Sequence, residues 1–225
     1  MGEVGAVIVA AGRSERMGGI DKLFAPLAGR PLLSHTIQAF QEAPCVDRIA
    51  IVAGERNWGA VGELVRVAGF AKVTAVVRGG ARRQDSVLAG LEVLAGVELA
   101  AVHDGARPLA TPGLVTRVVE AARAGGAAIC AIPVRDTVKE VDQAQVARTL
   151  DRGRLWLAQT PQAFRLDLLL EAHRRFEGEA TDDAAMVEAL GHPVRVVEGD
   201  PHNLKVTTPE DLRLLESLVR LREGM

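Results

Sequence analysis

The sequence predicts one α/β domain spanning residues 1–225, in which a mostly parallel sheet is flanked by helices. Short apolar runs alternate along the chain with segments of helical periodicity. The apolar runs contain few polar residues, as in strands that are covered on both faces. The chain is 48% hydrophobic, which is enough to bury one sizeable core. No repeat, low-complexity tract or linker divides it.

The individual elements follow from these patterns in chain order. Strands are expected at 4–9, 48–53, 73–76, 99–103, 127–132 and 194–197. Helices are expected at 32–42, 58–68, 84–95, 112–124, 166–175, 182–190 and 209–222. Two helix starts carry a threonine followed by proline, at Thr111 and at Thr208. Threonine is a good N-cap, and proline suits the first helical position.

Residues 133–157 interrupt the alternation of strands and helices. Valines alternate with charged residues around polar turns, and no helical period is present. We predict a β-hairpin arm that projects from the sheet. A solvated surface hairpin without a further role is the alternative that the pattern leaves open.

Composition excludes several classes of protein. The net charge is -2, whereas proteins that bind nucleic-acid duplexes are usually basic. No apolar run approaches the roughly 18 residues of a membrane span, and the first residues lack a basic signal region. Cys45 and Cys130 are too few for a disulfide framework or a zinc site. We expect a soluble cytoplasmic protein that uses both thiols in its core.

The segment after the first strand predicts a phosphate-binding loop. In an open α/β sheet, ligands bind at the carboxyl ends of strands. Ala10, Ala11 and Gly12 allow close approach of a ligand, and consecutive N–H groups can hold phosphates. Arg16 and Lys22 add cations to the same loop. The fingerprints GxGxxG and GxxxxGK[ST] are missing from it, and an ordinary glycine-rich turn is the alternative.

Three further segments carry candidate residues. Asp104 and Arg107 follow a strand, where a carboxylate can hold Mg²⁺ or a ribose hydroxyl and an arginine can bind phosphate. A glycine pair at 79–80 leads into a helix whose first turn can present backbone groups to a base edge. Lys205 is one of only four lysines, on a short predicted strand before the last helix. Lys205 is either a compact positive charge that binds a phosphate or an ordinary lysine at the edge of the site.

Together these segments resemble the 2-C-methyl-D-erythritol 4-phosphate cytidylyltransferase family. The matching blocks, in the family's order, are AAGxxxRM…K, GGAxRxDSV, HDGARP, PVRDTVK, LWLAQTPQ, ATDDA and NLKVTTPEDL. They cover nearly the whole chain. The first block alone would indicate only the wider nucleotidyltransferase superfamily, and the others are more specific. Asp21 stands where a proline is frequent in the family, and Ala81 where an acidic residue is common.

The resemblance implies a Rossmann-like fold and transfer of the cytidylyl group of CTP, with Mg²⁺, to methylerythritol 4-phosphate, releasing pyrophosphate. The residues implied around the nucleotide are Ala10, Ala11, Gly12, Gly80, Ala81, Ser86 and Gly105. The implied cations around the reacting phosphates are Arg16, Lys22 and Lys205. The implied acceptor ligands are Asp104, Arg107, Thr137, Arg152 and Thr181. Asp104 is also the one candidate metal ligand, beside phosphates that would hold most of the Mg²⁺.

The resemblance also implies a homodimer with shared active sites, because the family's arm reaches into the partner subunit. Thr137 and Arg152 lie on the predicted arm and would complete the neighbour's site. Three other functions compete with this one. A ribitol 5-phosphate cytidylyltransferase would share the nucleotide loops. A binding module without catalysis would need fewer cations, and a nicotinamide-dependent oxidoreductase would carry the missing GxGxxG.

Overall fold

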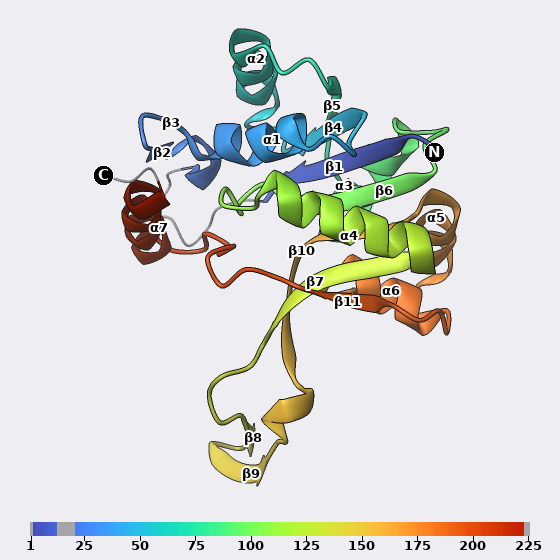
Figure 1. The fold of residues 1–225 in the computed structure, drawn as a ribbon, viewed down its shortest axis with the longest axis vertical. Helices are drawn as coiled ribbons and strands as arrows, with labels where there is room; N and C mark the ends of the chain where they lie inside the picture. Colours follow the sequence, from blue (N-terminus) through green and yellow to red (C-terminus); the bar gives the residue numbers. More distant parts are fainter. Residues whose placement is uncertain (1, 13–20, 223–225) are drawn as a thin grey trace.

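A sheet of seven strands forms the centre of the structure, a computed structural model that describes residues 2–12 and 21–222 (Figure 1). The strand order is β11-β7-β10-β6-β1-β4-β5. The strands are β11 (Arg195–Glu198), β7 (Ala127–Pro133), β10 (Trp156–Arg165), β6 (Leu99–Asp104), β1 (Val4–Ala10), β4 (Arg48–Ala53) and β5 (Val73–Arg78). Parallel pairing joins β6, β1, β4 and β5, and also β11 and β7. The mostly parallel α/β fold is therefore confirmed.

Strand β10 was not predicted, and it runs antiparallel to both of its neighbours, β6 and β7. Its middle contains Gln159, Thr160 and Gln162, which are polar and nevertheless buried. Their hydrogen-bond partners come from distant segments, so the local pattern did not resemble a buried strand. The reversed strand joins the two parallel parts of the sheet.

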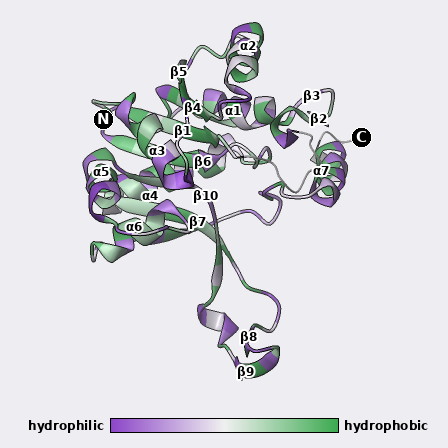
Figure 2. Cartoon of the chain, turned by 180° about the vertical axis from the view of Figure 1, so that it is seen from behind, coloured by the Kyte–Doolittle hydropathy of each residue, from purple (hydrophilic) through white to green (hydrophobic). Residues whose placement is uncertain are grey.

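Helices cover both faces of the sheet (Figures 1 and 2). One face packs against α1 and α4, and the core extends to residues of α2 and α7. The other face packs against α3, α5 and α6. The helices are α1 (Leu32–Glu42), α2 (Trp58–Ala68), α3 (Arg83–Glu92), α4 (Pro112–Gly125), α5 (Leu166–Arg175), α6 (Asp183–Ala189) and α7 (Pro209–Arg222).

Both predicted helix caps are present. The Thr111 side chain accepts a hydrogen bond from Leu114 N at the start of α4. Thr208 Oγ1 accepts one from Asp211 N at the start of α7. None of the described helices has the length and apolarity that a bilayer span requires. Cys130 is buried on β7, and burial raises the pKa of its thiol to about 12, as expected of a core cysteine.

The predicted arm is present as a hairpin that extends well beyond the sheet (Figure 1). Strands β8 (Lys139–Asp142) and β9 (Gln145–Thr149) pair antiparallel, and every residue in them is exposed. The two loop residues, Gln143 and Ala144, both have positive φ, as a type I′ hairpin turn requires. A 3₁₀ turn, η3 (Arg152–Arg154), leads the chain back to β10.

The short elements around the sheet differ from expectation at Lys205 and in a second hairpin that was not predicted. Lys205 was predicted on a strand, but residues 203–207 form an irregular segment. A backbone hydrogen bond from Val206 N to Ala106 O joins this segment to the loop that follows β6. A second short hairpin pairs β2 (Pro26–Leu27) with β3 (Arg30–Pro31), after the 3₁₀ turn η2 (Lys22–Phe24).

Candidate active site

A cavity in the described structure lies at the carboxyl ends of β1 and β6. These strands are neighbours, with Val9 paired to Asp104, so the loops that follow them meet. The cavity has a volume of about 450 Å³. Its lining includes nine predicted site residues: Ala10, Ala11, Gly12, Lys22, Gly80, Ala81, Ser86, Asp104 and Lys205.

The loop after β1 is held by Asn57. The Asn57 side chain donates to Ala10 O at 3.2 Å and to Asp21 Oδ2 at 2.9 Å. Asp21 also caps η2 by accepting from Leu23 N. The two described ends of the loop are therefore fixed relative to each other. Arg16, predicted on this loop, lies outside the described residues.

Lys22 lies at the start of η2 and faces the segment that carries Lys205. Its Nζ donates to Val206 O at 2.8 Å. Two lysines far apart in the chain are thus brought to the same wall of the cavity. This arrangement concentrates positive charge where the sequence predicts phosphates.

Gly80, the second glycine of the pair before α3, also lines this cavity. A Cβ on Gly80 would lie 2.4 Å from Asp85 Cβ, and one on Gly79 would lie 2.6 Å from Ser86 Oγ. Neither position has room for a side chain. Gly80 N donates to Ser86 Oγ, and Ser86 Oγ donates to Arg82 O. The turn is therefore rigid and brings its backbone close to the cavity.

Asp104 lies among three cationic side chains. Its carboxylate lies 2.9 Å from Lys205 Nζ and 3.5 Å from the Nε atoms of both Arg83 and Arg107. Burial alone would raise the pKa of Asp104, but Lys205, Arg83 and Arg107 outweigh burial and hold that pKa well below its usual range. Asp104 remains ionised and keeps three cations together.

A second cavity, of about 240 Å³, lies beyond Asp104. It contains two more predicted residues, Arg107 and Thr181. Three residues line both cavities: Arg83, Asp104 and Lys205. Two cations and a carboxylate therefore form the boundary between the cavities.

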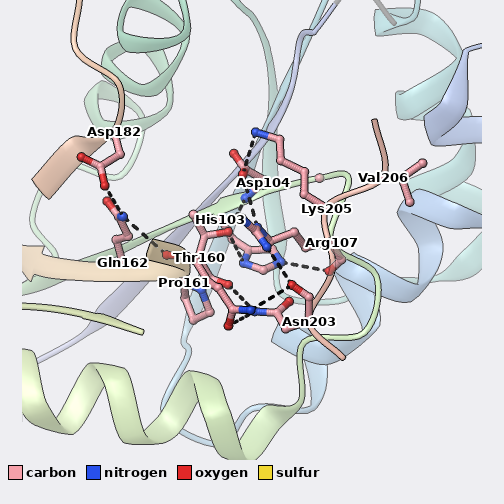
Figure 3. Close-up of polar contacts among 12 residues, drawn as sticks. His103, Asp104, Arg107, Thr160, Pro161, Gln162, Asp182, Asn203, Lys205 and Val206 are labelled. Carbon is pink, nitrogen blue, oxygen red and sulfur yellow. Dashed lines mark hydrogen bonds and ion pairs between the residues drawn. The ribbon is translucent and has the colours of Figure 1, made fainter. Parts of the chain in front are cut away.

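Behind this boundary, His103 is completely buried and takes part in a chain of hydrogen bonds (Figure 3). Its Nε2 lies 3.1 Å from Arg107 O, and a carbonyl can only accept, so Nε2 carries the proton. Its Nδ1 then accepts from Thr160 Oγ1, which in turn accepts from Asp104 N. Burial lowers the pKa of His103 to about 4. The neutral ring therefore fixes the backbone on both sides of Asp104.

Arg107 is positioned by the segment before Lys205 (Figure 3). Its Nη1 donates to Asn203 O at 2.7 Å, and Asn203 Nδ2 donates to Thr160 O at 2.8 Å. Strand β10 and residues 203–205 thus form one hydrogen-bonded wall. The glutamine Gln162 extends this wall to α6 by donating to Asp182 Oδ2.

Three predicted residues in the described ranges do not line either cavity. Thr137 and Arg152 are exposed on the arm, where Arg152 Nη1 donates to Arg135 O. Gly105 lies behind the first cavity, where a Cβ would approach Val9 O to 3.0 Å and Thr36 Oγ1 donates to the Gly105 carbonyl. The structure gives Gly105 a packing role next to the site.

Sequence reasoning missed several residues that line the cavities: Leu23, Arg82, Arg83, Gln159, Thr160, Gln162, Asp182 and Thr207. Those of β10 were hidden because that strand was not predicted. Arg82 and Arg83 lie inside a quoted block, GGAxRxDSV, but no role was assigned to either. Their position directly after a glycine turn at the end of a strand could have identified both arginines as candidate site residues.

The charges around Asp104 bear on a metal ion. The described residues contain no group of three His, Cys, Asp or Glu side chains arranged to hold one. Asp104 is the one described carboxylate that lines the first cavity, and three cations already surround it. Such a donor set suits a metal that arrives with phosphate ligands better than one held by the protein alone.

Comparison with known proteins gives a consistent result. The family model described as 2-C-methyl-D-erythritol 4-phosphate cytidylyltransferase matches residues 4–221. The enzyme of that name from Dehalococcoides mccartyi strain CBDB1 is 50% identical over 219 residues, covering 97% of this chain and 96% of the relative. The crystal structure of 2-C-methyl-D-erythritol 4-phosphate cytidylyltransferase from Thermus thermophilus is 38% identical in sequence, with a TM-score of 0.79. The match covers 95% of this chain and 98% of that chain. A crystal structure of 4-diphosphocytidyl-2C-methyl-D-erythritol synthase from Anaerococcus prevotii has a TM-score of 0.87 at 28% identity, covering 97% and 96%.

Proposed function

The chain belongs to the 2-C-methyl-D-erythritol 4-phosphate cytidylyltransferase family, and we propose here how its two cavities divide the family's reaction. The enzyme transfers the cytidylyl group of CTP to 2-C-methyl-D-erythritol 4-phosphate and releases pyrophosphate, a step of isoprenoid precursor biosynthesis. One observation carries the proposal. Two cavities meet at Asp104 and Lys205, so two anionic ligands can approach each other beside fixed positive charge.

CTP occupies the larger cavity in this proposal. The backbone of Ala10, Ala11 and Gly12 lies against the nucleotide and its triphosphate. The rigid turn at Gly80, with Ala81 and Ser86, faces the base. The close packing of Ala11 and of the turn at Gly80 supports these roles, because neither can move away from a ligand without disturbing its neighbours.

The acceptor occupies the smaller cavity. Arg107 and Thr181 line it, and Asp104 and Lys205 lie where it opens to the first cavity. An arginine fork suits a phosphate, and a carboxylate and a hydroxyl suit the alcohol groups of a polyol. Arg107 is fixed by Asn203 before any ligand is present, which supports a binding role.

The chemistry requires positioning and charge stabilisation. An oxygen of the acceptor phosphate forms a bond to the α-phosphorus of CTP. The bond from that phosphorus to the bridging oxygen breaks, and its electron pair leaves with pyrophosphate. The acceptor phosphate is already an anion, so no general base is needed. Lys22, Lys205 and Arg16 stabilise the charge that develops on the α-phosphate and the leaving group.

Mg²⁺ enters as part of the nucleotide substrate in this proposal. When bound, it screens the phosphate oxygens and favours a compact triphosphate. Asp104 is the one described carboxylate that lines the cavity assigned to the phosphates. Its three cationic neighbours support a role centred on the cations, with the phosphates holding most of the metal.

We further propose a homodimer in which the arm of one subunit completes the site of the other. An isolated two-stranded hairpin is at best marginally stable in water. On this arm Val141 and Val146 face each other across the strands, and they are 57% and 62% exposed. A partner subunit would cover them and would receive Thr137 and Arg152. Two free thiols support a reducing, cytoplasmic location for this dimer.

The assigned reaction is tested by pyrophosphate release from the purified protein with CTP and Mg²⁺. Methylerythritol 4-phosphate and ribitol 5-phosphate are compared as acceptors at equal concentration. Release with methylerythritol 4-phosphate alone is expected. Release with ribitol 5-phosphate alone would contradict the acceptor assignment, and no release with either would contradict the reaction.

A further inference from the structure

We propose that Arg83 contacts the reacting phosphates at the boundary between the cavities, and that buried Asp183 positions it there. The inference rests on the proposed division of CTP and acceptor between the two cavities. It assigns a role to an arginine outside the predicted set of site residues. Three features support it: the place of Arg83, the way it is held, and the charge it meets.

Arg83 is one of the three residues that line both cavities, with Asp104 and Lys205. The reaction needs the acceptor phosphate and the α-phosphate to come within bonding distance. That meeting takes place where the cavities join, so any cation at the boundary faces both anions. Arg83 and Lys205 lie on either side of Asp104 at this point.

The Arg83 guanidinium is held mainly by Asp183. Nη1 lies 2.8 Å from Asp183 Oδ2, and the Asp183 side chain is fully buried. The other Asp183 oxygen has no hydrogen-bond partner among the described residues, and Nε2 of buried His173 lies 3.6 Å from it. A buried carboxylate needs a charged partner, so Asp183 keeps Arg83 in place when the cavities are empty.

The guanidinium retains the capacity to bind a ligand. It has five N–H groups in a fixed plane, and its contacts with carboxylates use Nη1 for Asp183 and Nε for Asp104. Its side chain is 26% exposed, on the walls of both cavities. The contact with Asp104 is long, at 3.5 Å, and can be exchanged for a phosphate oxygen.

The side chains on either side of Arg83 also connect the two cavities. Arg82 and Gln84 both donate to Gly178 O, and Ala180 N donates to Gln84 Oε1. The segment held in this way leads directly to Thr181 in the second cavity. The residues on both sides of Arg83 thus fix the acceptor wall relative to the nucleotide wall.

The test compares Arg83→Gln, Asp183→Asn and the double variant with wild type. Initial rates are measured against each substrate separately. We expect Arg83→Gln to lower kcat/KM for the acceptor about 10²-fold, with a smaller change in CTP affinity. Arg83→Gln leaves the buried Asp183 carboxylate without its charged partner. The double variant removes that carboxylate and should regain the folding stability that Arg83→Gln loses, but its turnover should stay as slow as that of Arg83→Gln. Asp183→Asn keeps the Arg83 cation and loses only its positioning. Its kcat/KM for the acceptor should therefore lie between those of wild type and Arg83→Gln.

A matched control is Arg123→Gln. Arg123 is also a largely buried arginine paired to a carboxylate, Glu98, but it lines neither cavity. Its expected kcat/KM for the acceptor is that of wild type. Methylguanidinium added to Arg83→Ala should restore part of the rate, and it should have no effect on wild type.

Two results would overturn the inference. One is wild-type acceptor kinetics in the folded double variant. The other is an equal loss in Arg83→Gln and Arg123→Gln, which would reveal a general effect on stability. Wild-type protein is assayed alongside. Its failure to release pyrophosphate would contradict the proposed function itself, whereas active wild type with active variants contradicts only the role of Arg83.

Discussion

The cavity boundary and the arm carry predicted site residues under opposite conditions. At the boundary, Asp104 and His103 are buried and joined to their neighbours by hydrogen bonds and ion pairs within one chain. On the arm, Thr137 and Arg152 are exposed, and the apolar pair Val141 and Val146 is uncovered. The boundary is organised before a ligand binds. The arm carries predicted site residues without a surrounding cavity.

The difference between the two regions indicates which part of a site one chain forms by itself and which part needs a second subunit in our proposal. Charge stabilisation in catalysis depends on dipoles and charges that need no rearrangement when the reaction occurs. The described chain supplies such an arrangement at the cavity boundary, where our proposal places the phosphates. What it does not supply around Thr137 and Arg152 is any wall of a cavity, and in our proposal a second subunit provides that wall.

The largest expected effect is at the cavity. Lys22→Ala removes a cation placed beside the Lys205 segment, and we expect kcat to fall about 10²–10³-fold while the protein stays folded. Steady-state kinetics and circular dichroism on the same sample measure both quantities. Lys72→Ala is the control, since Lys72 donates to Ala43 O away from the cavities. Near-normal turnover of Lys22→Ala would remove Lys22 from the mechanism.

The next prediction concerns the buried side of the comparison. His103 has a folded pKa of about 4, below the usual 6.5 or so of an unfolded histidine. Between these values the unfolded chain binds a proton that the folded chain excludes. The free energy of unfolding should therefore decrease as pH falls from about 6.5 to about 4, by about 3 kcal/mol in all.

Urea unfolding at several pH values measures this dependence. His103→Gln should remove this part of the slope, and His202→Gln should retain it because His202 is exposed outside the network. Equal slopes in wild type and His103→Gln would show that His103 does not contribute.

The arm should respond to loss of apolar contact. Val141→Asp combined with Val146→Asp places two like charges opposite each other on the hairpin. We expect dimerisation to weaken by about 10²-fold, since two valines would no longer be buried. Sedimentation and activity against protein concentration measure the change. Val67→Asp, on exposed α2, is the control, and an unchanged dimer in the double variant would contradict a role of this face.

The smallest effect is expected at an exposed ion pair of the arm. Arg148 and Glu140 are paired, with side chains 68% and 49% exposed. Exposed pairs contribute between about 0 and 1 kcal/mol, so Glu140→Gln should change the melting temperature little. A large loss of stability by differential scanning calorimetry would mean that this pair is buried in an assembled form.

The sequence was sufficient for much of the fold because its signals are local. Helix α2 and helix α7 have the predicted bounds, Trp58–Ala68 and Pro209–Arg222, since caps and apolar spacing lie within each segment. Strand β10 was missed because Thr160 and Gln162 are made acceptable in the core by His103 and Asp182, which are far away in the chain.

The site shows the same distinction. Lys22, Asp104 and Lys205 were predicted because they follow strands or belong to family blocks, and the structure brings them to one cavity. Arg83 was quoted only as part of a block and was given no role. Its significance depends on Asp183, which is 100 residues further along the chain. No spacing rule connects two residues at that separation.

Mixing two inactive variants tests the division between cavity and arm most directly. Lys22→Ala disables the cavity of its own chain, and Arg152→Ala disables the arm it would contribute to a partner. With free subunit exchange, half of the dimers are mixed and each has one intact site, so about a quarter of wild-type activity should return. Recovery to that level, with each variant inactive alone, is the result that the account predicts. A mixture as inactive as its components, with subunit exchange demonstrated, would contradict shared active sites.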